Sequence, residues 1–363
     1  MPSLAIVGAG LAGLAAAHAL RAARPDVRIT VVEKARGVSG RAATRWTDVE
    51  HPDGQTRRWR YDHGAQYASP DADGRAAALL RAVAGGALAD VPGAVWPFDD
   101  DGTLRPDRAR PQAGPRWTTP DGIAELGRRL AAATPDLDLR LQTRVASVAR
   151  VADGWRLALD DGAPLDADAV LLTAPGPQAA ALVRDGRPEA PELAALADAL
   201  DAVPYRSQFA LAWGFDRTLA RPADVYALVN APEHGAPGGG HAVAWLAVES
   251  DKPHRAPDGC TLLLLQMSAG WTEAHYDDAP ERLHAAARAP AEALWGALPG
   301  PLWTGQQRWR YALPDGALDA SARAAAEPLG LFVAGDLTAG SGRVHRALDE
   351  GLSVTHRLLP TLP

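Results

Sequence analysis

Two apolar runs near the start of the chain flank a segment with helical character. Leu4–Val7 is a short, continuous apolar run, which is typical of a buried strand. Leu11–Ala23 is rich in Ala and Leu and stops at Arg24-Pro25-Asp26, which predicts a helix with a defined end. Val27–Glu33 is a β-branched run and predicts a second strand. These residues therefore predict one strand–helix–strand unit of the kind that builds parallel sheets.

Similar patterns recur later in the chain. Residues 169–174 and 331–334 are nearly continuous apolar runs, which predicts two more buried strands. Residues 137–150 and 155–159 alternate in polarity, which predicts a small antiparallel meander. A helix is expected from Pro120-Asp121-Gly122 to Ala133, with Asp121 as its N-terminal cap, and another helix over the last twenty residues.

The middle of the chain is richer in strand patterns. Residues 209–215, 242–248 and 261–267 predict strands, and residues 280–298 predict a helix. We expect an α/β fold in which a doubly wound domain (residues 1–70, 116–182 and 320–363) is interleaved with a sheet-rich α+β domain (residues 71–115 and 183–319).

Composition narrows the class of protein. The 363 residues are 47% hydrophobic and 22% charged, as in ordinary globular proteins. The net charge of −7 predicts no nucleic-acid partner. Cys260 is the only cysteine, so no disulfide within the chain and no CxxC pair can form, and no metal-ligand spacing stands out. No stretch has the length and purity of a membrane span, and we expect a cytoplasmic protein.

The first chemical motif lies between the two predicted N-terminal strands. Gly8-Ala9-Gly10-Leu11-Ala12-Gly13 has the spacing G-x-G-x-x-G, directly after a strand and at the start of a helix. Such glycines let the backbone approach a pyrophosphate, which the free N–H groups of the helix then bind. Glu33 ends the second strand, where a carboxylate binds ribose hydroxyl groups and would repel a 2′-phosphate. The motif predicts a dinucleotide site, with FAD favoured because the Arg36–Arg41 loop adds basic and glycine residues that a plain NAD site does not need.

Five blocks of sequence resemble one family. Glu33–Arg45, Tyr61–Tyr67, Arg308–Ala312, Gly335-Asp336 and Gly340–Val344 are similar to blocks of the flavin amine-oxidase superfamily, most closely its bacterial renalase-like members. The resemblance implies a Rossmann-like FAD domain of the monoamine-oxidase and hydroxybenzoate-hydroxylase type.

The glycine motif and the resemblance together give a candidate FAD-binding set. It consists of Gly8, Gly10, Leu11, Ala12, Gly13, Glu33, Lys34, Arg36, Gly40, Arg41, His63, Gly64, Ala65, Gln66, Val145, Thr173, Ala174, Gly335, Asp336, Gly342, Arg343 and Val344. The resemblance implies that Asp336 binds the ribityl chain or the pyrophosphate, that Val145 meets the adenine, and that Arg343 and Val344 begin a helix aimed at the flavin ring.

The chain also departs from the family pattern. His345-Arg346 follows Val344 where renalase-like chains often carry Glu-Gly. Monoamine oxidases attach flavin through a cysteine near the C-terminus, which this chain lacks, so FAD is expected to be non-covalent. Many amine oxidases place a lysine near the flavin; Lys252 is the one lysine outside the cofactor loop, and we predict a surface turn for it.

The reaction is less closely defined by the sequence than the cofactor. Residues that could shape the substrate site are His63, Gln66, Trp245, Trp309, Tyr311 and His345. The resemblance implies oxidation of a small molecule, a 2- or 6-dihydro isomer of NAD(P), by hydride transfer to flavin, with oxygen or a quinone as acceptor. The alternatives are an amine or amino acid oxidase, an aromatic monooxygenase, and a non-catalytic dinucleotide-binding protein. The oligomeric state stays open.

Overall fold

The computed structural model describes residues 1–109, 114–221, 224–232 and 240–363. A parallel sheet of five strands in the order β18-β12-β1-β2-β8 is built around the N-terminal strand. Its strands are β1 (Ser3–Val7), β2 (Arg28–Val32), β8 (Asp138–Arg140), β12 (Ala169–Leu172) and β18 (Leu331–Val333). Helix α1 (Leu11–Ala23) joins β1 to β2, which confirms the predicted strand–helix–strand unit.

Helices and a meander cover the two faces of this sheet. Ile6 and its neighbour Val31 pack in one core with α1, α3 (Glu125–Ala132) and α10 (Val344–Leu358). Ala5 and Val7, which point to the opposite face, pack in a second core. That core contains α4 (Gly176–Asp185), α5 (Pro191–Asp201), β9 (Val145–Val151), β10 (Gly154–Leu159) and β11 (Leu165–Ala167).

Two local predictions in this region need correction. The small antiparallel meander forms as β9-β10-β11, but residues 138–140 are not part of it, because β8 joins the parallel sheet. Asp138 lies opposite Thr30 in the parallel register, and the Thr30 hydroxyl donates a hydrogen bond to the Asp138 carboxylate at 3.1 Å. The helix does not start at Asp121, which is exposed; α3 begins at Glu125, after a turn that Gly122 makes with φ +100°.

A second sheet has six strands in the order β17-β13-β16-β15-β14-β6. All its neighbours are antiparallel except β14 and β6. The strands are β6 (Ala94–Phe98), β13 (Tyr205–Phe215), β14 (Val225–Asn230), β15 (Val243–Val248), β16 (Thr261–Met267) and β17 (Trp303–Pro314). Helix α7 (Pro280–Trp295) packs on one face through Leu283 and Ala287.

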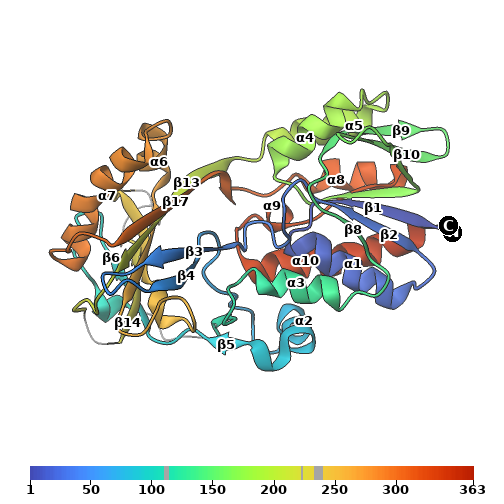
Figure 1. Ribbon diagram of the computed structural model, residues 1–363. Coiled ribbons are helices and arrows are strands. Elements are labelled where there is room, and N and C mark those ends of the chain that lie inside the picture. The colour runs from blue at the N-terminus through green and yellow to red at the C-terminus, as the bar shows by residue number, and fades with distance from the viewer. Residues whose placement is uncertain (110–113, 222–223, 233–239) are drawn as a thin grey trace.

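The hairpin β3 (Thr44–Glu50) and β4 (Thr56–Asp62) packs on the other face of this sheet, where Trp59 meets Ala212 and Leu264. The long strands β13 and β17 lead from the parallel-sheet side into the six-stranded sheet, so the two halves lie side by side (Figure 1). The smaller elements are α2 (Arg75–Ala84), β5 (Ala89–Asp90), β7 (Trp117–Thr118), α6 (Ala269–Ala274), α8 (Ala320–Ala326) and α9 (Asp336–Ala339).

Both halves together confirm the α/β class with a parallel Rossmann-like sheet and a second, mixed-sheet domain. Among the described helices, none combines the length and the apolar character that crossing a membrane requires.

Candidate active site

A single continuous cavity of about 2250 Å³ runs from the glycine turn to the six-stranded sheet. Its walls come from both halves of the molecule: from β1, β2 and the starts of α1 and α10 at one end, and from β13, β15, β16 and β17 at the other. This volume exceeds the roughly 300–1000 Å³ of a pocket for one small ligand. It is therefore large enough for a dinucleotide and a second molecule.

The glycine turn fits a closely approaching pyrophosphate. Gly8 has φ +111°, a conformation that L side chains rarely adopt, and a Cβ at Gly13 would lie 2.3 Å from the Gly8 carbonyl oxygen. A Cβ at Gly10 would meet no atom within 4 Å, because that position faces the cavity. Helix α1 starts at Leu11 with no acidic residue in its first turn, so its free N–H groups and positive dipole end are available to an anion.

Glu33 closes the dinucleotide end of the cavity. One carboxylate oxygen accepts a hydrogen bond from the Ala9 amide at 3.0 Å, and the other accepts one from the Ala35 amide at 2.8 Å. A carboxylate has about four acceptor positions, so capacity remains for ribose hydroxyl groups. Glu33 thus holds the glycine turn in place and could bind the ligand as well.

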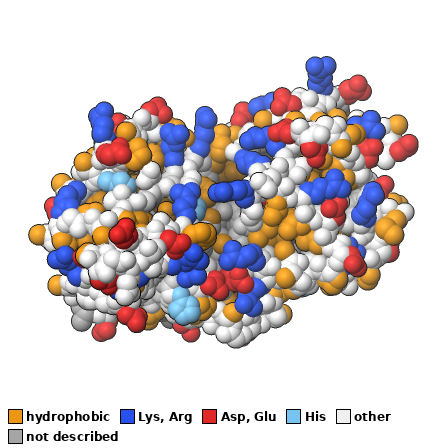
Figure 2. Space-filling model, in the orientation of Figure 1, with side chains coloured by type: hydrophobic (Ala, Val, Ile, Leu, Met, Phe, Trp, Pro, Cys, Tyr) orange, Lys and Arg blue, Asp and Glu red, His pale blue; other side chains and the backbone are white. Residues whose placement is uncertain are grey.

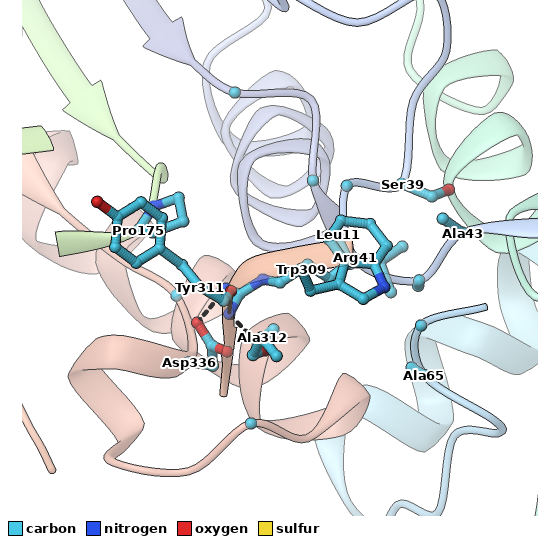
Figure 3. Close-up of a pocket in the computed structure, with 18 of the residues that line it drawn as sticks. Leu11, Ser39, Arg41, Ala43, Ala65, Pro175, Trp309, Tyr311, Ala312 and Asp336 are labelled. Atoms are coloured by element: carbon cyan, nitrogen blue, oxygen red, sulfur yellow. Dashed lines mark hydrogen bonds and ion pairs between the residues drawn. The ribbon is translucent and has the colours of Figure 1, made fainter. Parts of the chain in front are cut away.

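Arg41 makes its contacts within the protein. Its guanidinium donates to Asp336 at 2.6 Å and to the carbonyl oxygens of Tyr311 and Ala312 at 3.3 and 3.0 Å (Figure 3). It therefore connects strand β17 to the first residue of α9. Arg41 belongs to the candidate FAD-binding set and also lines the cavity.

Close packing and hydrogen bonds hold the segment Gly64–Gln66 in place. A Cβ at Gly64 would lie 1.9 Å from the Arg41 carbonyl oxygen, so only glycine fits there. The Gly64 carbonyl accepts from the side-chain amides of Gln266 at 2.6 Å and Gln66 at 3.1 Å. Gln66 also accepts a hydrogen bond from Lys252 at 3.2 Å, which orients its amide.

Lys252 is not on a surface turn, so that prediction is wrong. Its side chain has no exposed surface and lies 3.1 Å from Asp62 and 2.7 Å from Glu249. Arg255 completes a buried cluster of four charges, 2.8 Å from Asp62 and 3.2 Å from Glu249. Burial alone would raise the pKa of Asp62, but Lys252 and Arg255 beside it hold that pKa well below its usual range. Lys252 does not line the cavity; Gln66 lies between them.

Aromatic rings form much of the wall beside the six-stranded sheet. Trp309 stacks on His63 with ring centres 5.4 Å apart, and its indole donates to the His63 carbonyl at 2.7 Å. Tyr67 and Trp245 lie 6.2 Å apart and are backed by the fully buried Tyr226. Burial lowers the pKa of His63 to about 4, and the nearby Arg45 contributes to this shift, so His63 is neutral at pH 7.

Most sequence-predicted site residues lie on this cavity. Of the candidate FAD-binding set, all line it except Gly13, which packs beneath the turn. Of the substrate-site candidates, His63, Gln66, Trp245, Trp309 and Tyr311 line it and His345 does not. The sequence analysis missed the polar wall residues Arg206, Ser207, Gln208, Asn230, Gln266 and Arg310. A polar residue within an apolar strand, such as Gln266 after four leucines, was the available signal.

Charge is distributed unevenly along the wall. The dinucleotide end carries five basic and three acidic side chains: Lys34, Arg36, Arg41, Arg128 and Arg144, with Glu33, Asp185 and Asp336. Beside the six-stranded sheet, the described wall carries three basic side chains, Arg45, Arg206 and Arg310, and one acidic side chain, Asp315, while Arg343 lies at the start of α10. A chain of net charge −7 therefore encloses a basic cavity.

Comparisons with known proteins agree with this architecture. The family described as flavin containing amine oxidoreductase matches residues 101–359, and an NAD(P)-binding Rossmann-like domain matches residues 6–83. A proposed protoporphyrinogen oxidase from Exiguobacterium sp. 255-15 has a similar structure, with TM-score 0.77 at 18% identity over 98% of both chains.

Two other solved structures share the fold. Putrescine oxidase bound to putrescine gives a TM-score of 0.67 at 16% identity, over 99% of this chain and 100% of that chain. Reduced UDP-galactopyranose mutase gives 0.73 at 11% identity, over 99% and 94%. Identities this low establish the fold and nothing about substrates. The family match covers most of the sequence, and the chain therefore belongs to the flavin containing amine oxidoreductase family, whose members are FAD-dependent oxidoreductases.

Proposed function

We propose that this protein is an FAD-dependent oxidase that removes two electrons from a carbon–nitrogen unit of a small substrate, with an amine or amino acid as the first candidate. The observation that carries the proposal is the continuous cavity, which joins the dinucleotide end to a wall of aromatic and amide side chains. Bound FAD would supply the hydride acceptor. We further propose that the parallel-sheet half binds the cofactor and the six-stranded half binds the substrate. The boundaries between them differ from those of the sequence analysis, because α2 and α5 pack with the parallel sheet and the hairpin β3–β4 packs on the six-stranded sheet.

The residues of the chain would have distinct tasks. The glycine turn and Glu33 would hold the adenosine and pyrophosphate, and the start of α10, with no acid in its first turn, would favour negative charge developing on the ring. Trp245 and Tyr67 would exclude water from the reacting carbon. Cys260 does not line the cavity, which supports non-covalent binding of the cofactor.

The described wall beside the six-stranded sheet carries no lysine, and this bears on the substrate. Lys252 is enclosed in the charge cluster, and His63, with its pKa of about 4, is a weak proton acceptor at pH 7. An amine would therefore have to bind as its free base. A dihydronicotinamide needs no deprotonation before it loses hydride, and this observation supports the renalase-like activity as a second candidate.

Anaerobic mixing of the FAD-loaded protein with a substrate panel tests the proposal. The panel contains benzylamine, putrescine, phenylalanine and the 2- and 6-dihydro isomers of NAD. Rapid loss of the oxidised flavin absorbance with an amine supports the first candidate, and loss with the dihydro isomers alone supports the second. Reduction by neither class, or by NADPH only when a phenol is present, would contradict both.

The pH dependence provides a second readout. For an amine, kcat/KM should rise about tenfold per pH unit below the amine pKa, because only the free base reacts. For a dihydronicotinamide it should stay nearly flat over the same range. Acid precipitation should release FAD into the supernatant; flavin retained in the pellet would contradict non-covalent binding.

A further inference from the structure

At the end of the cavity beside the six-stranded sheet, basic side chains outnumber acidic ones. At the dinucleotide end, the excess of two positive side chains matches the two negative charges of a pyrophosphate. Beside the six-stranded sheet, Arg45, Arg206 and Arg310 exceed Asp315 by two positive charges, and none of these three arginines belongs to the candidate FAD-binding set. Figure 2 shows Lys and Arg side chains gathered around the hollowed middle of the molecule.

The arginines at this end are poorly paired. Arg206 lies 3.6 Å from Asp315, and its enclosed Nε–H has no hydrogen-bond partner in the described part of the chain. Arg45 donates only to the neutral groups of Gln306 and Gln307. Arg310 has no carboxylate within ion-pair distance among the described residues, and its guanidinium lies 5.7 Å from the Tyr311 ring centre.

Two of these arginines stand on neighbouring strands. Arg206 is the second residue of β13, and Arg310 lies in the irregular section of β17 opposite it, where the pairing skips from Gln208 with Trp309 to Arg206 with Leu313. Arg343 is close enough to Tyr67 to lower the pKa of that hydroxyl, against the larger effect of burial, which raises it. Tyr67 and Trp245 therefore line the same cavity as Arg206 and Arg310.

We propose that this end recognises an organic anion: a substrate whose oxidisable, apolar part lies against Tyr67 and Trp245 and whose carboxylate or phosphate is bound by Arg206 and Arg310. This inference rests on the proposed function and specifies its substrate class. Like charges repel, so a cationic polyamine is disfavoured beside these arginines. A diamine would need an acidic side chain for its second ammonium group. On this part of the described wall, Asp315 is the one acidic side chain.

Two matched pairs of ligands test the charge without turnover. Benzoate and benzamide differ by a carboxylate, and nicotinamide mononucleotide and nicotinamide riboside differ by a phosphate. Each ligand is titrated into the FAD-loaded protein, and Kd is read from the perturbation of the flavin spectrum. The charged member of at least one pair should bind about 10- to 100-fold more tightly, as expected for a charge-assisted hydrogen bond.

Two variants and one control identify the residues. Arg206→Gln and Arg310→Gln should each remove most of that preference. Arg308→Gln is the control, because Arg308 lies two residues away on β17, donates to the Tyr276 carbonyl at 2.6 Å and does not line the cavity. It should leave both preferences unchanged.

The possible outcomes separate the hypotheses. A preference in the benzoate pair alone indicates a carboxylate substrate, and one in the mononucleotide pair alone indicates a phosphate. Equal binding within both pairs, tighter binding of benzylamine than of benzoate, or an unaltered preference in both variants would overturn the proposal. Anion binding without flavin reduction by any panel substrate would instead contradict the proposed oxidase function and leave the anion site standing.

Discussion

Replacing Arg255 by methionine should cost far more stability than the same change at Arg156. Both guanidiniums contact carboxylates through two nitrogen atoms. Arg156 binds Asp166 at 2.8 and 2.9 Å, and both side chains are more than half exposed. Arg255 has no exposed surface, binds Asp62 at 2.8 Å and Glu249 at 3.2 Å, and donates to three backbone carbonyl oxygens.

The magnitudes follow from solvation. Removing one partner of a buried ion pair leaves an uncompensated charge and costs about 3–5 kcal/mol, whereas an exposed pair contributes about 0–1 kcal/mol. In the Arg255→Met variant, Asp62 and Glu249 would share one remaining cation. The pKa of Asp62 should then rise toward its usual range, because burial raises it and one of the two cations that lower it is gone. A carboxyl group whose folded pKa is depressed adds stability above its unfolded pKa of about 4 and loses it as pH falls, so the variant should lose that contribution.

Equilibrium urea unfolding of the apoproteins at pH 7 measures this difference. Ligand binding would otherwise add its own stabilisation, so the cofactor is removed first. Tryptophan fluorescence and circular dichroism should give coincident transitions, with a midpoint clearly lowered by Arg255→Met and almost unchanged by Arg156→Met. Equal losses in the two variants would refute the reasoning that burial determines the value of these ion pairs.

Three further predictions concern the cavity. Gly13→Ala should destabilise the fold, because its Cβ would lie 2.3 Å from a carbonyl oxygen. Gly10→Ala should keep wild-type stability and bind FAD more weakly. Equal effects of the two substitutions on the free energy of unfolding would contradict this prediction. Glu33→Gln should weaken FAD binding about tenfold, because the variant loses the negative charge and one of the two side-chain oxygens that accept hydrogen bonds from backbone amides. An unchanged Kd in a flavin fluorescence titration would count against this prediction. Burial lowers the pKa of His63 to about 4 in the folded protein. As the pH falls, the unfolded state therefore binds a proton at His63 before the folded state does, and the free energy of unfolding should drop by roughly 3 kcal/mol between pH 6.5 and 4. His63→Phe should flatten that slope and the exposed control His356→Gln should retain it; a slope unaffected by His63→Phe would disprove the assignment.

The dinucleotide end of the site could be predicted because its requirements are local. Gly8 and Gly10 must sit between a strand and a helix within a few residues, and Glu33 must end the next strand. These constraints appear directly in the sequence as spacing. Val145 and Thr173 could be predicted only from the resemblance to a family, and both line the cavity.

The buried charge cluster could not be predicted in this way. Glu249, Lys252 and Arg255 lie within seven residues that also contain Asp251 and Pro253, a composition typical of a solvated turn. They are buried because Asp62, nearly two hundred residues earlier, meets them across the hairpin and the second sheet. Long-range charge compensation leaves no periodic signal along the chain. The same is true of Arg206 and Arg310, which are far apart in the sequence and line one cavity because β13 pairs with β17.

The two groups of charged residues have opposite roles, and the difference lies in pairing. The buried cluster contains two acids and two bases in mutual contact, so it is neutral as a whole and can fix the Gly64–Gln66 segment without attracting a ligand. The arginines on the cavity wall face open space with few carboxylates, so their field extends into the cavity. An enzyme that oxidised cationic amines would gain from the reverse arrangement, with acids on the wall. The way this chain divides its charges therefore favours a substrate that enters as an anion and keeps its reacting nitrogen uncharged.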